Sequence, residues 1–101
     1  MLNGFEEDFL QDFVKIYILE SARQERIYPK DIIEELKEIK CEVELGMLHS
    51  LFHKLHQKGY VEVETSFVKG KIRKYYLITK KGKKALEFAK SRYQDLMDLI
   101  V

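Results

Sequence analysis

The chain has 101 residues, close to the commonest size of a single domain, so we expect one domain, over residues 1–101, with one hydrophobic core. Charged residues make up 35% of the chain, but the formal net charge is only +1. No apolar run approaches the roughly 18 to 20 residues of a membrane helix, the acidic N-terminus is unlike a signal peptide, and the single cysteine, Cys41, cannot form an internal disulfide. These features argue against membrane-spanning and disulfide-rich secreted proteins, and we expect a cytoplasmic protein that has no membrane partner.

A long amphipathic helix is predicted over residues 5–23. Its apolar residues recur at helical spacing, in a stripe of Phe5, Phe9, Phe13, Ile16 and Tyr17 that is widened by Val14, Ile18 and Leu19. The stripe is broader than the core of one small domain requires. Its first residues, Leu2, Phe5 and Phe9, are therefore either part of the core or a contact surface for another molecule.

The next two helices are predicted to form a helix-turn-helix pair. Residues 23–27 are a polar connection, and Pro29 opens a helix that ends near Lys40, since proline is tolerated at the first helical position. The buried stripe of this helix is Ile32, Ile33, Leu36 and Ile39. A short link over residues 40–44 leads to a third helix over residues 46–58, with a buried face of Leu48, Leu51, Phe52 and Leu55. A link this short is typical of helix-turn-helix motifs, in which the second helix reads DNA.

The outward face of the third helix contains no carboxylate. A rotation of about 100° per residue places on this face Gly46, Ser50, His53, Lys54 and Gln57, with Met47 and His49 on its flanks. The preceding helices, by contrast, are rich in acids. A helix in the major groove lies beside phosphates, so an acid-free face favours DNA binding.

A β-hairpin with a basic tip is predicted next. Gly59 is expected to end the third helix in a left-handed conformation, and residues 60–65 alternate apolar and charged side chains like a strand with one wet face. Residues 67–71 form the turn and residues 72–78 the second strand. Residues 65–86 carry eight bases and no acid, whereas residues 1–48 carry 12 acids and 6 bases. The hairpin end should therefore attract phosphate.

A last helix is predicted over residues 80–101, with Thr79 as its N-cap. Its apolar residues alternate three- and four-residue steps, as in a coiled coil. Such an apolar terminal helix indicates pairing with a second copy of the chain, although it could instead fold back on its own core. The residues predicted for a dimer interface are Phe5, Phe9, Leu86, Ala89, Tyr93, Leu96, Met97 and Ile100.

Two segments resemble the PadR-like family of winged-helix transcriptional regulators. Residues 46–61, GMLHSLFHKLHQKGYV, are similar to the family's recognition-helix segment, which typically reads Gly-Thr-Leu-Tyr-Pro-Leu-Leu-x-Arg-Leu-Glu-x-x-Gly-Leu-Val. Residues 73–82, RKYYLITKKG, are similar to its Arg-Lys-Tyr-Tyr-x-Leu-Thr-x-x-Gly motif. With the helices before them the match covers roughly residues 13–87. The resemblance implies a mostly helical α+β fold, a winged helix-turn-helix of order α-α-α-β-β-α, in which about residues 5–82 bind DNA and about residues 80–101 dimerise.

The resemblance also implies a function. Family members bind operator DNA as homodimers, usually as repressors, so we expect a sequence-specific, double-stranded DNA-binding regulator on a palindromic operator, with no cofactor. The residues expected to contact DNA are Lys30, Met47, His49, Ser50, His53, Lys54, Lys69, Lys71, Arg73 and Lys74. Either Tyr75 or Tyr76 should pack under the recognition helix.

The chain departs from the family pattern at its expected phosphate contacts. His49 and Ser50 stand where the family usually has Tyr and Pro. The sequence Tyr28-Pro29-Lys30 stands where His-Gly-Tyr is usual, so a charge from Lys30 would replace a tyrosine contact with phosphate. The contacts at these positions must therefore differ from those of typical members.

Other functions remain as alternatives. Three histidines, His49, His53 and His56, share one flank of the third helix, and histidines four residues apart can share a transition metal, but no acid or cysteine belongs to the same motif and no metal site is expected. An enzyme is not expected, because no nucleophile motif or phosphate-cradling glycine loop is present. The alternatives are an architectural DNA-binding protein similar to the bacterial replication terminator, and a winged helix reused as a protein-interaction module.

Overall fold

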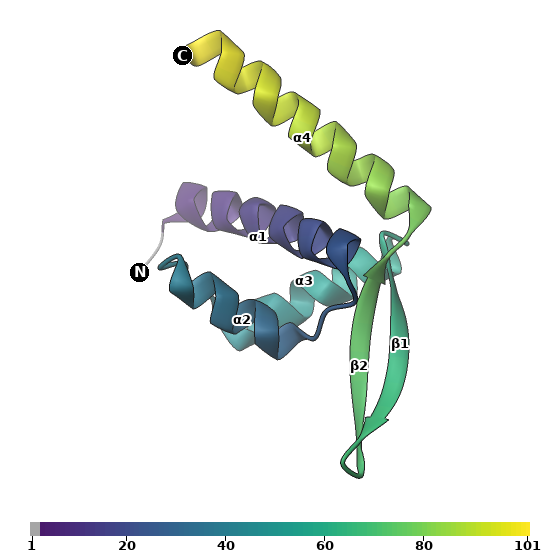
Figure 1. Cartoon of the computed structure of the whole chain (residues 1–101). Coiled ribbons are helices and arrows are strands. Elements are labelled where there is room, and N and C mark those ends of the chain that lie inside the picture. The colour runs from purple at the N-terminus through teal and green to yellow at the C-terminus, as the bar shows by residue number, and fades with distance from the viewer. Residues whose placement is uncertain (1–2) are drawn as a thin grey trace.

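A computed structural model describes residues 3–101 and shows four helices and one β-hairpin (Figure 1). The elements follow the predicted order: α1 (Gly4–Gln24), α2 (Pro29–Glu38), α3 (Leu45–Gln57), β1 (Val61–Val68), β2 (Lys71–Ile78) and α4 (Lys80–Ile100). In Figure 1, α1 lies between α4 and the α2–α3 pair, and the hairpin projects away from all the helices. Leu2, the first residue of the predicted apolar surplus, lies outside the described residues.

The core is built from one face of each helix and the base of β1. Buried residues of α1, namely Val14, Ile18, Leu19 and Ala22, meet Ile32 and Leu36 of α2, the four predicted core residues of α3, Val61 and Leu86. The aromatic half of the predicted α1 stripe is instead exposed: Phe5 by 82%, Phe9 by 56% and Phe13 by 37%. The stripe divides because Phe9 and Phe13 lie on the side of α1 that lines a groove with α4, whereas Val14 and Ile18 face the core.

The connection between α1 and α2 pairs with the hairpin. The backbone N–H of Ile27 donates to the carbonyl of Tyr76, and the N–H of Tyr76 donates back to Ile27, both at 2.9 Å. Ile27 is buried, although its segment was predicted to be only a polar connection. This bridge ties the segment before α2 to the last residues of β2, at the base of the hairpin, and so limits how the hairpin can swing.

The hairpin is longer and its turn tighter than predicted. The strands pair antiparallel from Val61 with Ile78 to Val68 with Lys71, so only Lys69 and Gly70 remain in the turn. Both have positive φ, 51° for Lys69 and 76° for Gly70, as in the two-residue turns whose twist matches that of a β-ribbon. The strand pairing therefore continues to the tip of the hairpin. We call residues 61–78 the wing.

Helix ends follow the predicted signals at most positions. Gly59 has a φ of 79° after the end of α3, as expected. The Thr79 side chain accepts a hydrogen bond from the N–H of Gly82 at 3.0 Å, and its hydroxyl donates to the carbonyl of Gly59 at 2.6 Å. The end of α2 was misplaced, since the helix stops at Glu38 and Ile39 is 55% exposed rather than buried.

The first turns of α4 are fixed to the core, but the rest of the helix is not. A Cβ placed on buried Gly82 would lie 2.0 Å from the carbonyl oxygen of Tyr60, so only glycine allows this approach. Leu86, one turn later, is 1% exposed. The prediction that Leu86 belongs to a dimer interface was wrong, because this residue completes the core of its own chain. Residues 91–101, in contrast, are all exposed.

No helix within residues 3–101 is long and apolar enough to cross a membrane.

Candidate nucleic-acid interface

α3 presents an exposed face without any acid. Leu48, Leu51, Phe52 and Leu55 are buried, which leaves Ser50, His53 and Lys54 in solvent on the opposite side. His49 is exposed on the flank. Met47, which was also predicted to contact DNA, is half-buried and packs against the core, so little of its side chain is available.

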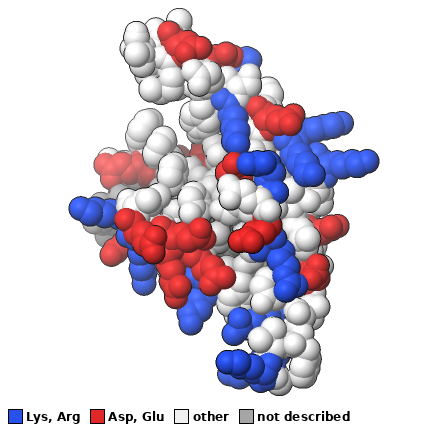
Figure 2. Space-filling model, viewed as in Figure 1, with Lys and Arg blue, Asp and Glu red and all other residues white. Residues whose placement is uncertain are grey.

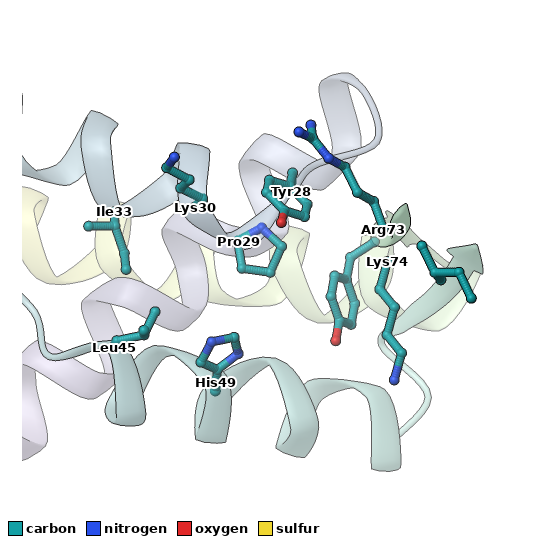
Figure 3. Close-up of a pocket in the computed structure, with 10 residues that line it drawn as sticks. Tyr28, Pro29, Lys30, Ile33, Leu45, His49, Arg73 and Lys74 are labelled. Atoms are coloured by element: carbon teal, nitrogen blue, oxygen red, sulfur yellow. The ribbon is translucent and has the colours of Figure 1, made fainter. Parts of the chain in front are cut away.

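Four of the predicted DNA-binding residues line one groove of about 630 Å³. Lys30 comes from the start of α2, His49 from α3, and Arg73 and Lys74 from β2 (Figure 3). The start of α2, the positive end of its helix dipole, also borders the groove. Three cations, one from α2 and two from β2, line this groove beside a helix N-terminus, an arrangement that suits an anion such as a DNA phosphate.

Apolar side chains also line this groove, and one of its two tyrosines, Tyr76, packs the wing against α3. The ring of Tyr76 lies 4.5 Å from that of Phe52, centroid to centroid, and burial raises the pKa of the Tyr76 hydroxyl. The expectation that one of the two tyrosines of β2 packs under the recognition helix is therefore confirmed, with Tyr76 as that residue. The wing and α3 share a packed contact.

A stack of two aromatic rings between two arginine side chains secures the other side of the wing. The Arg26 guanidinium lies 4.2 Å from the ring centroid of Tyr75, which in turn lies 5.7 Å from the ring of Tyr28. Arg73 continues the stack at 5.0 Å from the Tyr28 ring. Arg26 also forms an ion pair with Glu64 at 2.6 Å. This stack holds Arg73 at the groove.

The sequence did not predict this stack. Its four members lie in two segments of the chain, residues 26–28 and 73–75, with no shared periodicity. The one available signal was Tyr28, an aromatic residue directly before the proline that opens α2. Arg26 and Tyr75 thus orient a groove residue without lining the groove themselves.

The tip of the wing carries the remaining predicted cations. Lys69, in the turn, and Lys71, directly after it, are exposed, and neither of them lines the groove. The lower end of the molecule in Figure 2, where the wing projects in Figure 1, accordingly shows blue basic side chains, whereas red acidic side chains gather over the helices. The structure therefore places the predicted DNA-binding residues in three neighbouring areas: the groove, the α3 face and the wing tip.

A second exposed surface lies between α1 and α4, on the far side of the core. A groove of about 520 Å³ is lined almost entirely by apolar side chains, among them the predicted interface residues Phe9, Tyr93, Leu96 and Met97. Phe5 and Ile100 are exposed at 82% and 65%, and Ala89 is half-buried. A single chain thus leaves a continuous apolar surface in water.

One ion-pair network ties α1 to α4 at the edge of this apolar groove. Glu20 accepts hydrogen bonds from Arg23 at 2.7 and 2.9 Å and from Lys90 at 2.8 Å. The bonds from Arg23 and then Lys90 lower the pKa of Glu20 to about 2. The network fixes the spacing of the two helices where they diverge.

The histidine, cysteine and acidic side chains of residues 3–101 form no candidate metal site. That part of the chain contains no cluster of three or more histidine, cysteine or acidic side chains placed to hold a metal ion. Burial raises the pKa of the half-buried Cys41 thiol, so a smaller fraction of it is ionised to the thiolate at neutral pH.

Most of the chain is similar to one family of known proteins. The model of the Transcriptional regulator PadR-like family matches residues 18–88. No match is found among proteins with curated annotation.

Similar solved structures include regulators that span nearly the whole chain. The X-ray structure of a PadR-like transcription factor from Bacteroides fragilis is 25% identical, with a TM-score of 0.84 over 97% of this chain and 96% of that one. A protein from Streptococcus mutans UA159 is 26% identical, with a TM-score of 0.75 over 83% of this chain and 78% of the other. The shared architecture is the predicted winged helix-turn-helix, mostly helical and of order α-α-α-β-β-α.

One similar structure contains DNA. Bacillus subtilis PadR in complex with operator DNA is 25% identical, with a TM-score of 0.66 over 72% of this chain. The present chain corresponds to 44% of that protein, so the likeness is limited to less than half of its length.

Proposed function

The chain belongs to the PadR-like family of transcriptional regulators, and we propose that it is a repressor that binds a palindromic DNA operator as a homodimer. The observation that carries this proposal is that Lys30, Arg73 and Lys74, from two elements, line one groove beside the acid-free face of α3. The phosphate backbone of one strand of a duplex would lie in that groove. The proposal is supported by the operator-bound relative.

Each part of this surface has its own role in the proposal. α3 enters the major groove and reads base edges through Ser50 and His53, which are short and polar enough to approach them. Lys54 and the groove residues hold phosphates and fix the position of α3 without reading sequence. The wing reaches past α3 along the duplex. Contacts from three elements thus position one helix.

The homodimer part of the proposal rests on the apolar surface of α1 and α4. Tyr93, Leu96 and Met97 are each 42 to 48% exposed, and the helix that carries them extends beyond the core. Burying such side chains removes apolar area from water at roughly 25 cal/mol per Å². A second copy offers the same apolar surface by two-fold symmetry, which is how a homodimer pairs identical patches.

A symmetric dimer explains the expected form of the operator. Two copies of α3 related by a two-fold axis would enter successive major grooves, roughly 34 Å apart, and so read two inverted half-sites. A dimer that covers these turns blocks other proteins from the same DNA, which is the basis for proposing repression. No cofactor enters this mechanism.

Selection of bound duplexes from a random pool tests the proposal. We expect enrichment of a palindrome whose half-sites lie about one helical turn, roughly 10 base pairs, apart. Ser50→Ala should change the enriched sequence, whereas Lys74→Ala should weaken binding without changing it. Binding without enrichment would favour an architectural role, and an absence of duplex binding at low salt would favour a protein-interaction module.

A further inference from the structure

The wing tip exposes an apolar pair. Phe67 and Ile72 lie directly opposite each other in the strand register, immediately before and after the residues that flank the turn. Phe67 is 73% exposed and Ile72 is 66% exposed. Residues that oppose each other across an antiparallel ribbon point to the same face. The tip therefore presents an aromatic and a branched aliphatic side chain together, with most of their surface in water.

This pair lies on the side of the wing that packs against α3. Alternate residues of a strand share a face, so Ile72, Lys74 and Tyr76 point the same way. Tyr76 packs on Phe52 of α3, and Ile72 and Lys74 line the groove that also contains His49. The face of the ribbon that packs on the recognition helix through Tyr76 thus continues through Lys74 to the apolar pair at the tip.

The charges around the pair favour a nucleic acid over a protein as the occupant of this face. Lys74 lies on the same face, Lys69 lies in the turn, Lys71 is next to Ile72 in the chain, and residues 65–86 contain no acid. An apolar surface framed by cations is complementary to the DNA minor groove, which has base edges and sugars inside and a row of phosphates on each side. A purely apolar protein patch would give no reason for the cations.

The wing is long enough to reach that groove. Its strands have eight residues each, which corresponds to roughly 26 Å of ribbon. With α3 in the major groove, the neighbouring minor groove is centred about half a helical turn away, roughly 17 Å. The tip can therefore enter the minor groove while α3 stays in place.

The backbone of the turn points to the same role. Lys69 adopts a φ of 51°, a left-handed conformation that asparagine or glycine adopts with less strain in two-residue turns. Strain that persists at a tip is a reason to look for function there. A lysine at this position keeps a positive charge at the point of the wing that projects furthest.

We propose that Phe67 and Ile72 form an apolar wedge that enters the minor groove beside the half-site and partly unstacks one base step, while Lys69 and Lys71 hold the flanking phosphates. The wedge rests on the proposed DNA-binding function and adds to it. Insertion of apolar side chains of this kind kinks a duplex by roughly 20 to 90°. Pyrimidine–purine steps unstack most easily, so the operator should prefer such a step at that position.

The test uses duplexes recovered by the random-pool selection, with 2-aminopurine placed at successive adenines. The fluorescence of this base rises when it unstacks. At saturating protein, we expect a rise at one step per half-site, about half a helical turn from the bases that α3 reads. The rise should disappear in a Phe67→Ala, Ile72→Ala double variant, and affinity should fall about tenfold, as expected when one stacking interaction is removed.

Two control variants isolate the wedge. Val68→Ala removes an apolar side chain from the opposite face of the same ribbon and should keep the fluorescence rise. Phe67→Leu retains an apolar side chain and should keep most of it. If the double variant matched the parent in both affinity and fluorescence, the wedge would be wrong while DNA binding stood. If the parent bound no duplex, the proposed function itself would fail, and the wedge with it.

Discussion

The wing end and the α4 end of the molecule expose opposite kinds of surface. At the wing end, contacts within one chain hold the wing and one of the groove cations: Tyr76 packs on Phe52, and Arg73 lies over Tyr28. At the α4 end, residues 91–101 are all exposed, and they include six large apolar or aromatic side chains, Tyr93, Leu96, Met97, Leu99, Ile100 and Val101. A basic surface is stable in water without a partner, whereas an apolar one is not. One chain therefore completes the proposed DNA-binding surface but leaves the proposed dimer surface open.

The largest effect is expected on stability, from a substitution where α4 begins against the base of the wing. Gly82→Ala would place a Cβ 2.0 Å from the carbonyl oxygen of Tyr60, where α4 begins against the base of the wing. We expect a loss of about 3 kcal/mol or more in the free energy of unfolding, because backbone must move. Urea unfolding at one fixed protein concentration measures it.

Gly46→Ala is the matched control for that substitution. Gly46 also lies in a helix, but a Cβ there meets nothing within 4 Å. Alanine should leave stability unchanged or raise it by up to about 1 kcal/mol. Equal urea midpoints for Gly82→Ala and the parent would contradict the close approach of α4 to β1.

The next largest effect is expected on DNA affinity, from a variant that disrupts the proposed dimer surface and leaves the DNA-binding surface unchanged. A Tyr93→Asp, Leu96→Asp variant places two charges in the apolar groove between α1 and α4 and should be monomeric by light scattering. DNA affinity should then fall about 100-fold, because the two half-sites are no longer bound by one linked molecule. The fold should remain, since both residues are already exposed in the single chain.

Ser91→Asp controls for added charge on the same helix. Ser91 is exposed and does not line the apolar groove, so this variant should stay dimeric. A dimer that persists in the Tyr93→Asp, Leu96→Asp variant would remove α4 from the interface.

Removing the wing cations should weaken DNA binding and leave the dimer intact. The triple variant Lys69→Ala, Lys71→Ala, Arg73→Ala should bind all duplex sequences more weakly while remaining a dimer. The slope of log K against log salt should become shallower by about 0.9 for each phosphate that the variant no longer neutralises. Lys37→Ala, on the exposed side of α2 away from the groove, should leave the slope unchanged. Unaltered affinity in the triple variant would exclude the wing from the interface.

The smallest effect concerns the link between α1 and α4. The pKa of Glu20 is lowered from 4.5 to about 2, so its ion pairs stabilise the fold above pH 4.5 and are lost as the pH falls toward 2. Glu20→Gln should therefore reduce the melting temperature slightly at neutral pH and flatten its decline between pH 4.5 and 2. Glu87→Gln, an exposed carboxylate on α4, controls for the lost charge. Parallel melting curves for Glu20→Gln and the parent would contradict this role.

Features set by neighbouring residues could be predicted from the sequence. The order of the elements, the left-handed Gly59 and the cap at Thr79 depend on local patterns, and all were predicted correctly. Spacing also placed Ser50 and His53 on the exposed side of α3.

Features set by contacts between distant segments could not be predicted. Periodicity shows that α1 has an apolar stripe but not how far the core beneath it extends, so exposed Phe5 and buried Val14 looked alike. The Ile27–Tyr76 bridge and the Arg26–Tyr75–Tyr28–Arg73 stack join segments more than 40 residues apart, and no local pattern specifies such partners. The groove could be inferred only as a list of cations, because its shape depends on these contacts.

The salt dependence of duplex binding tests the central claim most directly. If the groove and wing cations of a dimer neutralise about six phosphates, log K should fall linearly with log salt with a slope of roughly −5. A steep slope that is halved in the monomeric Tyr93→Asp, Leu96→Asp variant would support a basic surface presented in two copies. A duplex affinity that is absent at low salt, or that does not change with salt, would contradict it.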